Sequence, residues 1–250
     1  MKYLYLLLNI GFILFPLVFT FHSKIKFYRK WRYLLPAILI MAVLFLVWDY
    51  LFTEWRIWTF NEDYITGVEF YGLPLEEILF YLCIPYSCVF IYETLIIYNV
   101  KNYLKRARLV SWVIIAGLIV TLFFNYHYLY TGVSFLFAIA YLFQLVVIHR
   151  VKWLGRFYMG YIASLVPFLI FTGMLTALPA VIYNDTEIMG IHLLTVPLEN
   201  LVYFFLVLLV TTALYERFHG RYKPIIDEAE AVIDEADIQA PDTHQNNIVL

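Results

Sequence analysis

Two widely separated segments of the chain carry the same tripeptide, and each tripeptide ends in a carboxylic acid. Residues 74–76 and 197–199 both read Pro-Leu-Glu, and each stands at the start of a long apolar run. Proline and glutamate suit the first turn of a helix, where they can cap it without doing chemistry. Helix starts do not need to repeat a tripeptide, however, and a carboxylate within an apolar segment is costly unless it serves a function. We therefore expect a catalytic or substrate-binding role for Glu76 and Glu199.

Two further acids extend this candidate site. Glu77 follows the first tripeptide directly, and Asp49 lies near the end of an earlier apolar run. In the second copy, Asn200 and Thr172 stand at the corresponding positions. Carboxyl groups gathered in a dry pocket cannot all be ionised, and a protonated acid beside an ionised one is what acid–base chemistry on an apolar substrate requires. The predicted catalytic residues are Asp49, Glu76, Glu77 and Glu199.

The composition indicates what surrounds these residues. Of the 250 residues, 63% are apolar and only 14% are charged, and the mean hydropathy is +0.77. So few charges cannot coat a water-facing globule of this length. A soluble enzyme, a nucleic-acid-binding protein and a disulfide-stabilised secreted domain are therefore excluded. Cys83 and Cys88 lie inside one apolar run, which favours packed thiols over a metal or redox site.

Apolar stretches recur along the chain at the length that a membrane-spanning helix needs, which is about 20 residues. They lie at residues 3–21, 34–52, 78–98, 109–125, 132–148, 158–178 and 197–215. We therefore predict an all-α integral membrane protein with seven transmembrane helices.

An internal repeat organises these helices. Residues 60–93 align without gaps to residues 183–216 at an offset of 123, and the matches include glycine, proline and acids as well as apolar residues. The offset carries the third stretch onto the seventh, so both units point the same way. Parallel repeats related by an axis along the membrane normal place equivalent residues at one depth. We therefore expect Glu76 and Glu199 to face each other across the bundle.

The predicted architecture is two parallel three-helix repeats joined by a linking helix. The predicted units are the first repeat at 1–100, the linking helix and loops at 101–131, the second repeat at 132–223 and an acidic, disordered cytoplasmic tail at 224–250.

The basic residues predict the orientation. Of the 17 Lys and Arg residues, only Lys2 and Arg56 fall outside the loops that follow the first, third, fifth and seventh stretches. The positive-inside rule therefore puts the N-terminus outside and the C-terminus in the cytoplasm of a multi-pass cell or inner membrane protein. Glu93 and Glu216 also match in the repeat, near the cytoplasmic ends of their stretches, and we expect interfacial ion pairs there.

Three segments carry a resemblance to a known family. WDYLFTEWRIWTFNEDYITG at 48–67 precedes LPLEEILFY at 73–81, and VPLENLVYF follows at 196–204. With these motifs the chain resembles the lycopene cyclase domain family, the non-flavin carotenoid cyclases of bacteria and fungi. The resemblance covers all seven predicted helices but not the tail.

The resemblance implies a redox-neutral isomerisation. An acid protonates the terminal double bond of a linear end group of lycopene, the tertiary cation cyclises, and a base removes a ring proton to leave a β-ionone ring. The resemblance implies that Glu76, Glu77 and Glu199 are the acid–base residues, with Asp49 in support. Asn200 departs from the family pattern, which prefers a second acid there.

Aromatic residues crowd the segment before the first motif, and they admit two interpretations. They could form an aromatic belt at the membrane surface, or a π-rich wall that stabilises a carbocation. The predicted substrate-binding residues are Trp48, Trp58, Phe60, Asn61, Tyr64, Pro74, Asn184, Pro197 and Asn200. We expect lycopene, membrane lipid and other carotenoid enzymes as partners. We expect no nucleic acid, metal or cofactor to bind. The chain has no GxGxxG motif, which a flavin-binding domain would need.

Other functions are also consistent with this pattern. An intramembrane acid could serve proton-coupled transport in a small seven-helix transporter, although a sugar pathway would need more polar residues inside the spans. The chain could also be a purely structural partner in a complex of carotenoid enzymes. Loss of its carboxylates would then leave the activity of the complex intact. A retinal-binding protein is excluded, because every lysine lies outside the seven stretches and a Schiff base needs one inside the last.

Overall fold

The computed structural model describes residues 2–100 and 106–221, and the predicted tail at 224–250 lies outside the described residues. These residues form seven α-helices: α1 (Leu4–Phe19), α2 (Trp31–Glu54), α3 (Leu75–Ile97), α4 (Ala107–Asn125), α5 (Leu129–Phe143), α6 (Leu154–Ala177) and α7 (Leu198–His219). A short 3₁₀ turn, η1 (Phe27–Lys30), precedes α2, and a π-helical turn, η2 (Gln144–Ile148), continues α5. Each predicted stretch overlaps one helix, and α5 begins inside the segment that we expected to link the repeats.

Six helical segments of the described chain are long and apolar enough to cross a membrane. The exception is α1, which has 16 residues and extends about 24 Å at 1.5 Å per residue, short of the roughly 30 Å of a hydrocarbon core. The predicted span at 3–21 is therefore shorter than expected. The chain is an all-α, multi-pass membrane protein.

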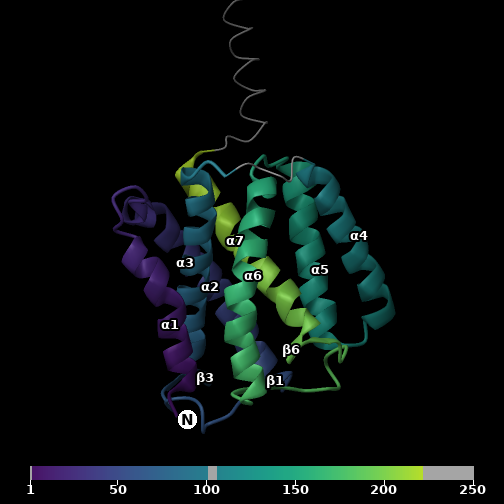
Figure 1. Cartoon of the computed structure of the whole chain (residues 1–250). Helices are drawn as coiled ribbons and strands as arrows, with labels where there is room; N and C mark the ends of the chain where they lie inside the picture. The colour runs from purple at the N-terminus through teal and green to yellow at the C-terminus, as the bar shows by residue number, and fades with distance from the viewer. Residues whose placement is uncertain (1, 101–105, 222–250) are drawn as a thin grey trace, which may run out of the picture.

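The helices stand side by side in one bundle, with α4 at its edge (Figure 1). The central helices are α3 and α7, the most buried of the six long segments. In each half the first helix packs along the third, α1 on α3 and α5 on α7. The middle helices cross over, because α2 packs on α7 and α6 packs on α3. The two halves are therefore interlocked around the α3–α7 centre.

Short strands join the two halves at the end of the bundle where the N-terminus lies (Figure 1). Strand β1 (Trp58–Phe60) pairs antiparallel with β4 (Val181–Tyr183), and Thr59 lies opposite Ile182. The two strands occupy equivalent positions of the repeat, at the offset of 123. A strand paired antiparallel with its own equivalent requires a two-fold relation, so the pseudo-two-fold axis passes between Thr59 and Ile182. This pairing confirms the internal repeat.

A hairpin precedes each central helix at the same end. Strands β2 (Glu69–Phe70) and β3 (Leu73–Pro74) lead into α3, and β5 (His192–Leu193) and β6 (Val196–Pro197) lead into α7. Gly67 and Gly190 are equivalent and have φ angles of 84° and 72°. Only glycine adopts this region without a steric cost, which explains why both copies of the repeat carry it.

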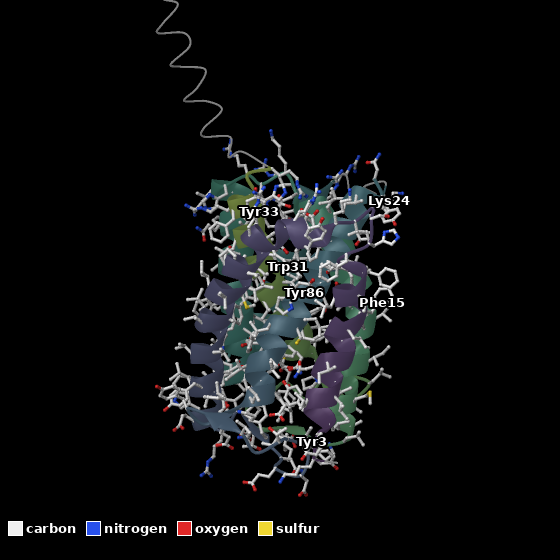
Figure 2. The ribbon with its side chains drawn as sticks, turned by 90° about the vertical axis from the view of Figure 1, so that its left-hand side faces the viewer. Tyr3, Phe15, Lys24, Trp31, Tyr33 and Tyr86 are labelled. Carbon is white, nitrogen blue, oxygen red and sulfur yellow. The ribbon has the colours of Figure 1, made fainter. Side chains whose placement is uncertain are left out.

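Paired charges and tyrosines hold the opposite end, where Lys24 and Tyr33 lie in Figure 2. The Tyr92 hydroxyl donates to Glu216 at 2.8 Å, and the equivalent Tyr215 hydroxyl donates to Glu93 at 2.7 Å. Lys30 and Arg221 form salt bridges with Glu93. The expected ion pairs of Glu93 and Glu216 are confirmed, with Arg221 bridging both acids.

Candidate active site

A small cavity lies where the two halves meet, close to the β1–β4 pair. Its volume is about 60 Å³. Most of its wall is aromatic, and the two acids in the wall come from the first half. The lining residues are Tyr5, Asp49, Trp58, Phe60, Glu77, Phe80, Tyr81, Tyr130, Phe168, Thr172, Leu175, Thr176, Val181, Tyr183, Asn200, Tyr203 and Phe204.

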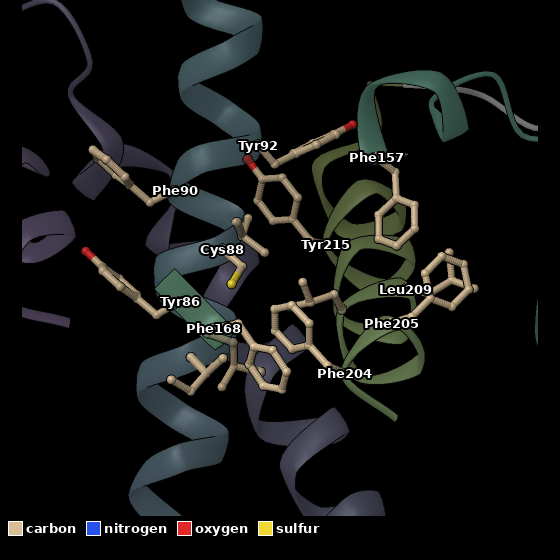
Figure 3. Packing of buried hydrophobic residues seen from close by; sticks show 14 of the residues in the cluster. Tyr86, Cys88, Phe90, Tyr92, Phe157, Phe168, Phe204, Phe205, Leu209 and Tyr215 are labelled. Carbon is tan, nitrogen blue, oxygen red and sulfur yellow. The ribbon is translucent and has the colours of Figure 1, made fainter. Parts of the chain in front are cut away.

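One wall of the cavity is part of the packed core between α3, α6 and α7. The rings of Phe168 and Phe204 stack face to face with 3.7 Å between their centroids, as Figure 3 shows. Both rings are nearly fully buried. The stack belongs to the same buried cluster as Cys88 and Tyr86 (Figure 3), so this side of the cavity is apolar.

Asp49, on α2, is fully buried and accepts hydrogen bonds from two tyrosines of the central helices. The Tyr81 hydroxyl of α3 donates to its Oδ2 at 2.7 Å, and the Tyr203 hydroxyl of α7 donates to its Oδ1 at 2.6 Å. The two hydroxyl oxygens are themselves 2.7 Å apart. Asp49 thus lies at the contact between the halves, held from both sides.

Glu77, on α3, points into the same cavity and is 8% exposed. The Tyr5 hydroxyl of α1 donates to its Oε2 at 2.6 Å. Glu77 and Asp49 line the same small cavity, and burial disfavours two negative charges side by side. A state in which one of the two carboxyl groups carries a proton is therefore favoured.

The second half repeats this arrangement without the acids. The Tyr130 hydroxyl donates to Asn200 at 2.9 Å, as Tyr5 does to Glu77, and the Asn200 amide donates to the Tyr183 hydroxyl at 2.7 Å. Burial raises the pKa of the Tyr183 phenol well above its usual range, so this hydroxyl stays neutral. Thr172 replaces Asp49 in the cavity wall. The cavity therefore holds one pair of carboxyl groups.

Glu76 and Glu199 bind the loops of their own halves. The Oε1 atom of Glu76 accepts the backbone N–H of Thr66 at 2.7 Å, and that of Glu199 accepts the N–H of Met189 at 2.6 Å. The Thr131 hydroxyl also donates to Glu199 at 2.8 Å. The Oε2 atoms of both glutamates are buried without a hydrogen-bond partner.

The structure shows no direct link between these two glutamates, and their expected facing across the bundle stays a prediction. Within the described part of the chain, no hydrogen bond joins Glu76 to Glu199, and neither of them lines the cavity. Adjacent residues of an α-helix point about 100° apart, and of Glu76 and Glu77 only Glu77 lines the cavity. Packing of α3 turns Glu77 toward the cavity and Glu76 toward the hairpin.

Of the nine predicted substrate-binding residues, Trp58, Phe60 and Asn200 line the cavity. Trp48 lies outside it and packs on Tyr203 and on Phe137 of α5.

The other five predicted binding residues shape the surrounding loops. Pro74 and Pro197 are the N-cap residues of α3 and α7. The Asn61 side chain accepts the backbone N–H of Asp63, and that of Asn184 accepts the backbone N–H of Thr186. The Tyr64 carbonyl accepts the backbone N–H of Tyr5 at 3.3 Å.

Sequence reasoning missed the tyrosines that contact the acids. Tyr81 follows Glu77 by four residues, and residues four apart share one face of a helix, so this partner could have been found. Tyr5 and Tyr203 lie on other helices, and no local pattern connects them to Asp49 or Glu77. Among the described residues, no three His, Cys, Asp or Glu side chains are placed to share a metal ion.

Comparison with known families matches most of the chain. A family model described as lycopene cyclase matches residues 2–95 and 127–218. The first segment covers α1, α2 and nearly all of α3, the second covers α5, α6 and nearly all of α7, and α4 lies between them. Comparison with curated proteins and with solved structures gave no match.

Proposed function

The chain belongs to the lycopene cyclase family, and we propose that it closes β-ionone rings on the linear end groups of lycopene, giving γ- and β-carotene. The observation that carries this proposal is the pair of buried carboxyl groups, Asp49 and Glu77, which line one mostly aromatic cavity. The reaction is an isomerisation, so no electrons are gained or lost and no cofactor has to accept them.

The carboxyl pair supplies both proton transfers of the cycle. One carboxyl group protonates the terminal carbon–carbon double bond and leaves a tertiary cation. An internal double bond attacks this cation, which forms the ring bond and moves the positive charge onto the ring. A carboxylate then removes a ring proton, and the electron pair of that C–H bond becomes the ring double bond. The pair regains its proton, so the protein is unchanged after each ring closure.

The cavity wall stabilises the cation between the two proton transfers. Trp58, Phe80 and Tyr203 are among the aromatic side chains that line the cavity, and an aromatic face attracts a cation by about 2 kcal/mol or more when the site is dry. The mostly aromatic wall also limits the access of water, which would otherwise add to the cation and give a hydroxylated product. Binding and charge stabilisation thus come from the same side chains.

We assign a positioning role to Glu76 and Glu199. Each glutamate anchors the loop that leads to a hairpin, and the hairpin sets the start of the helix that carries Glu77 or Asn200. Their anchoring bonds keep the central helices at the rotation that directs Glu77 into the cavity. Proton transfer in this proposal belongs to Glu77 and Asp49.

We further propose that the hairpin end faces the outside of a cell or inner membrane and the end with Lys24 faces the cytoplasm. Tyr3 and Lys24 lie at opposite ends of the bundle (Figure 2), and the basic residues of the loops favour the cytoplasmic side. The substrate then reacts in the outer half of the bilayer. Association with other carotenoid enzymes stays a prediction.

The test is pigment chromatography on a lycopene-accumulating bacterial strain that expresses the chain. New γ- or β-carotene peaks are expected with the wild type. Asp49→Asn and Glu77→Gln should each lower ring formation at least about 100-fold, the usual contribution of a general acid or base. Glu54→Gln is the matched control, because Glu54 lies on the same helix as Asp49 and is exposed.

Either of two results would overturn the proposal. Full activity of both carboxyl variants would remove the chemistry from this pair. Unchanged lycopene with the wild-type protein verified in the membrane would exclude this reaction and make proton-coupled transport the next function to test.

A further inference from the structure

A second hollow opens on the side of the bundle between α1, α3 and α6. Its volume is about 470 Å³, and its wall is almost entirely apolar. Leu7, Phe15 and Ile170 line it and are all more than half exposed, so the hollow faces the lipid. We call it the side groove.

Aromatic rings separate the side groove from the carboxyl cavity. Phe171 lines the groove and is 2% exposed. Its ring centroid is 6.1 Å from that of Tyr5 and 5.8 Å from that of Phe80, and both of these side chains line the cavity that contains Glu77. The groove and the cavity therefore share a wall made of Phe171 on the groove side and Tyr5 and Phe80 on the cavity side.

The matching position in the other half is filled by larger side chains. Trp48 is equivalent to Phe171 at the offset of 123, and its ring packs 5.0 Å from that of Phe137. The first helices match at an offset of 125, because the backbone N–H groups of Tyr5 and Tyr130 bond to equivalent carbonyls. Gly11 in the groove is therefore equivalent to Leu136.

The two equivalent places therefore differ in the size of their side chains. A Cβ atom added at Gly11 would meet nothing within 4 Å, whereas Leu136 carries a full side chain at the equivalent place. Phe171 is likewise smaller than Trp48. The half with the groove is also the half whose third helix carries Glu77.

We propose that the side groove binds the polyene arm of the substrate and that the end group passes Phe171 to reach the carboxyl pair. This inference rests on the proposed function. An apolar polyene is dissolved in the bilayer, so it needs a lateral path and not an aqueous one. Several rings in the groove, including Phe12 and Phe171, suit a conjugated chain, and the shared wall distinguishes this hollow from a lipid-filled cleft elsewhere.

The size of the closed cavity makes Phe171 a gate. An engineered cavity of about 150 Å³ binds benzene, whereas the carboxyl cavity measures about 60 Å³ and is too small for a six-membered ring. Rotation of Phe171 together with its neighbour Phe80 would join the two spaces and enlarge the reaction chamber. The aromatic partners of Phe171 would then line the passage.

The test fills the groove and measures binding and ring formation separately. Gly11→Trp should lower the lycopene that co-purifies with the Asp49→Asn protein at least tenfold, and should lower ring formation in the otherwise wild-type chain to the same extent. Gly117→Trp on α4 is the matched control, because a Cβ atom at Gly117 also meets nothing within 4 Å. This control should bind and convert lycopene as the parent does.

A second pair of variants covers a failure of Gly11→Trp to fold. Ile170→Trp should narrow the groove, and Val166→Trp, one turn away on α6 and outside the groove lining, should not. Both side chains are exposed, so both substitutions are tolerated by the core.

The outcomes separate this inference from the proposed function. Ring formation by the wild type and by both groove variants would overturn the groove while the cyclase function stands. If the wild type forms no rings, lycopene binding still tests the groove. Binding that is lost in the groove variants supports the inference. The inference is overturned if the parent binds no lycopene, or if parent and variants bind it equally. It is also overturned if a co-purified membrane lipid is lost only in the groove variants, because the groove is then a lipid site.

Discussion

At the scale of single residues, the acids that match in the repeat and the acids in the cavity are different ones. Glu76 and Glu199 match, and both bond to the backbone of their own loop. Glu77 and Asp49 are replaced by Asn200 and Thr172 in the second half, and they form the carboxyl pair. We infer that the symmetric acids serve the fold, which both halves need, whereas the asymmetric acids serve the reaction.

Substitution of the loop-binding glutamates tests this division of roles. Glu76→Gln and Glu199→Gln each keep an oxygen that accepts the loop N–H, so ring formation should stay within about fivefold of the wild type, and stability should fall by about 1 kcal/mol. Pigment ratios and thermal unfolding in detergent measure the two effects, with Glu77→Gln as the inactive reference. Loss of ring formation in a stable Glu76→Gln protein would instead assign Glu76 to proton transfer.

At the scale of elements, the two ends of the central helices are held by different means. Hairpins and the β1–β4 pair fix the end near the cavity, and buried ion pairs fix the other end. Glu93 is fully buried, so its charge depends on Lys30 and Arg221. This end is far along the helices from the cavity, so it should affect stability more than chemistry.

Removal of one charge partner tests the role of the ion pairs. Arg221→Ala leaves the buried Glu93 with one basic partner, and breaking a buried pair costs about 3 kcal/mol. Thermal unfolding in detergent should therefore occur at a lower temperature, while ring formation well below that temperature stays near the wild-type level. Arg217→Ala is the control, because Arg217 is exposed at the same end. Equal unfolding temperatures for the two variants would contradict a structural role for this network.

At the scale of the whole molecule, the pseudo-two-fold axis brings both halves to one reaction chamber. The chamber holds one carboxyl pair, although both halves contribute to its wall. A substrate with two linear ends therefore has to present them one after the other. The interlocked packing of α2 on α7 and α6 on α3 also means that neither half forms the chamber alone.

A time course tests the single chamber. Purified protein supplied with lycopene in vesicles should release γ-carotene first, and β-carotene should rise only as γ-carotene accumulates and binds again. Excess lycopene should compete with γ-carotene and delay the second ring. Appearance of β-carotene from the first turnover, with no free γ-carotene under excess lycopene, would show that both ends react without release.

The sequence by itself determined the membrane environment, the helices, the repeat and the family. Each of these depends on local features, such as apolar runs of the right length, the repeated Pro-Leu-Glu and the motif around Asp49 and Glu77. The tertiary structure alone decided that Glu77 and not Glu76 points into the cavity, that Tyr5 and Tyr203 reach the acids from other helices, and that Gly11 and Phe171 leave a side groove. The physical reason is that helix rotation and side-chain contacts are set by packing between segments far apart in the chain, which no local pattern records.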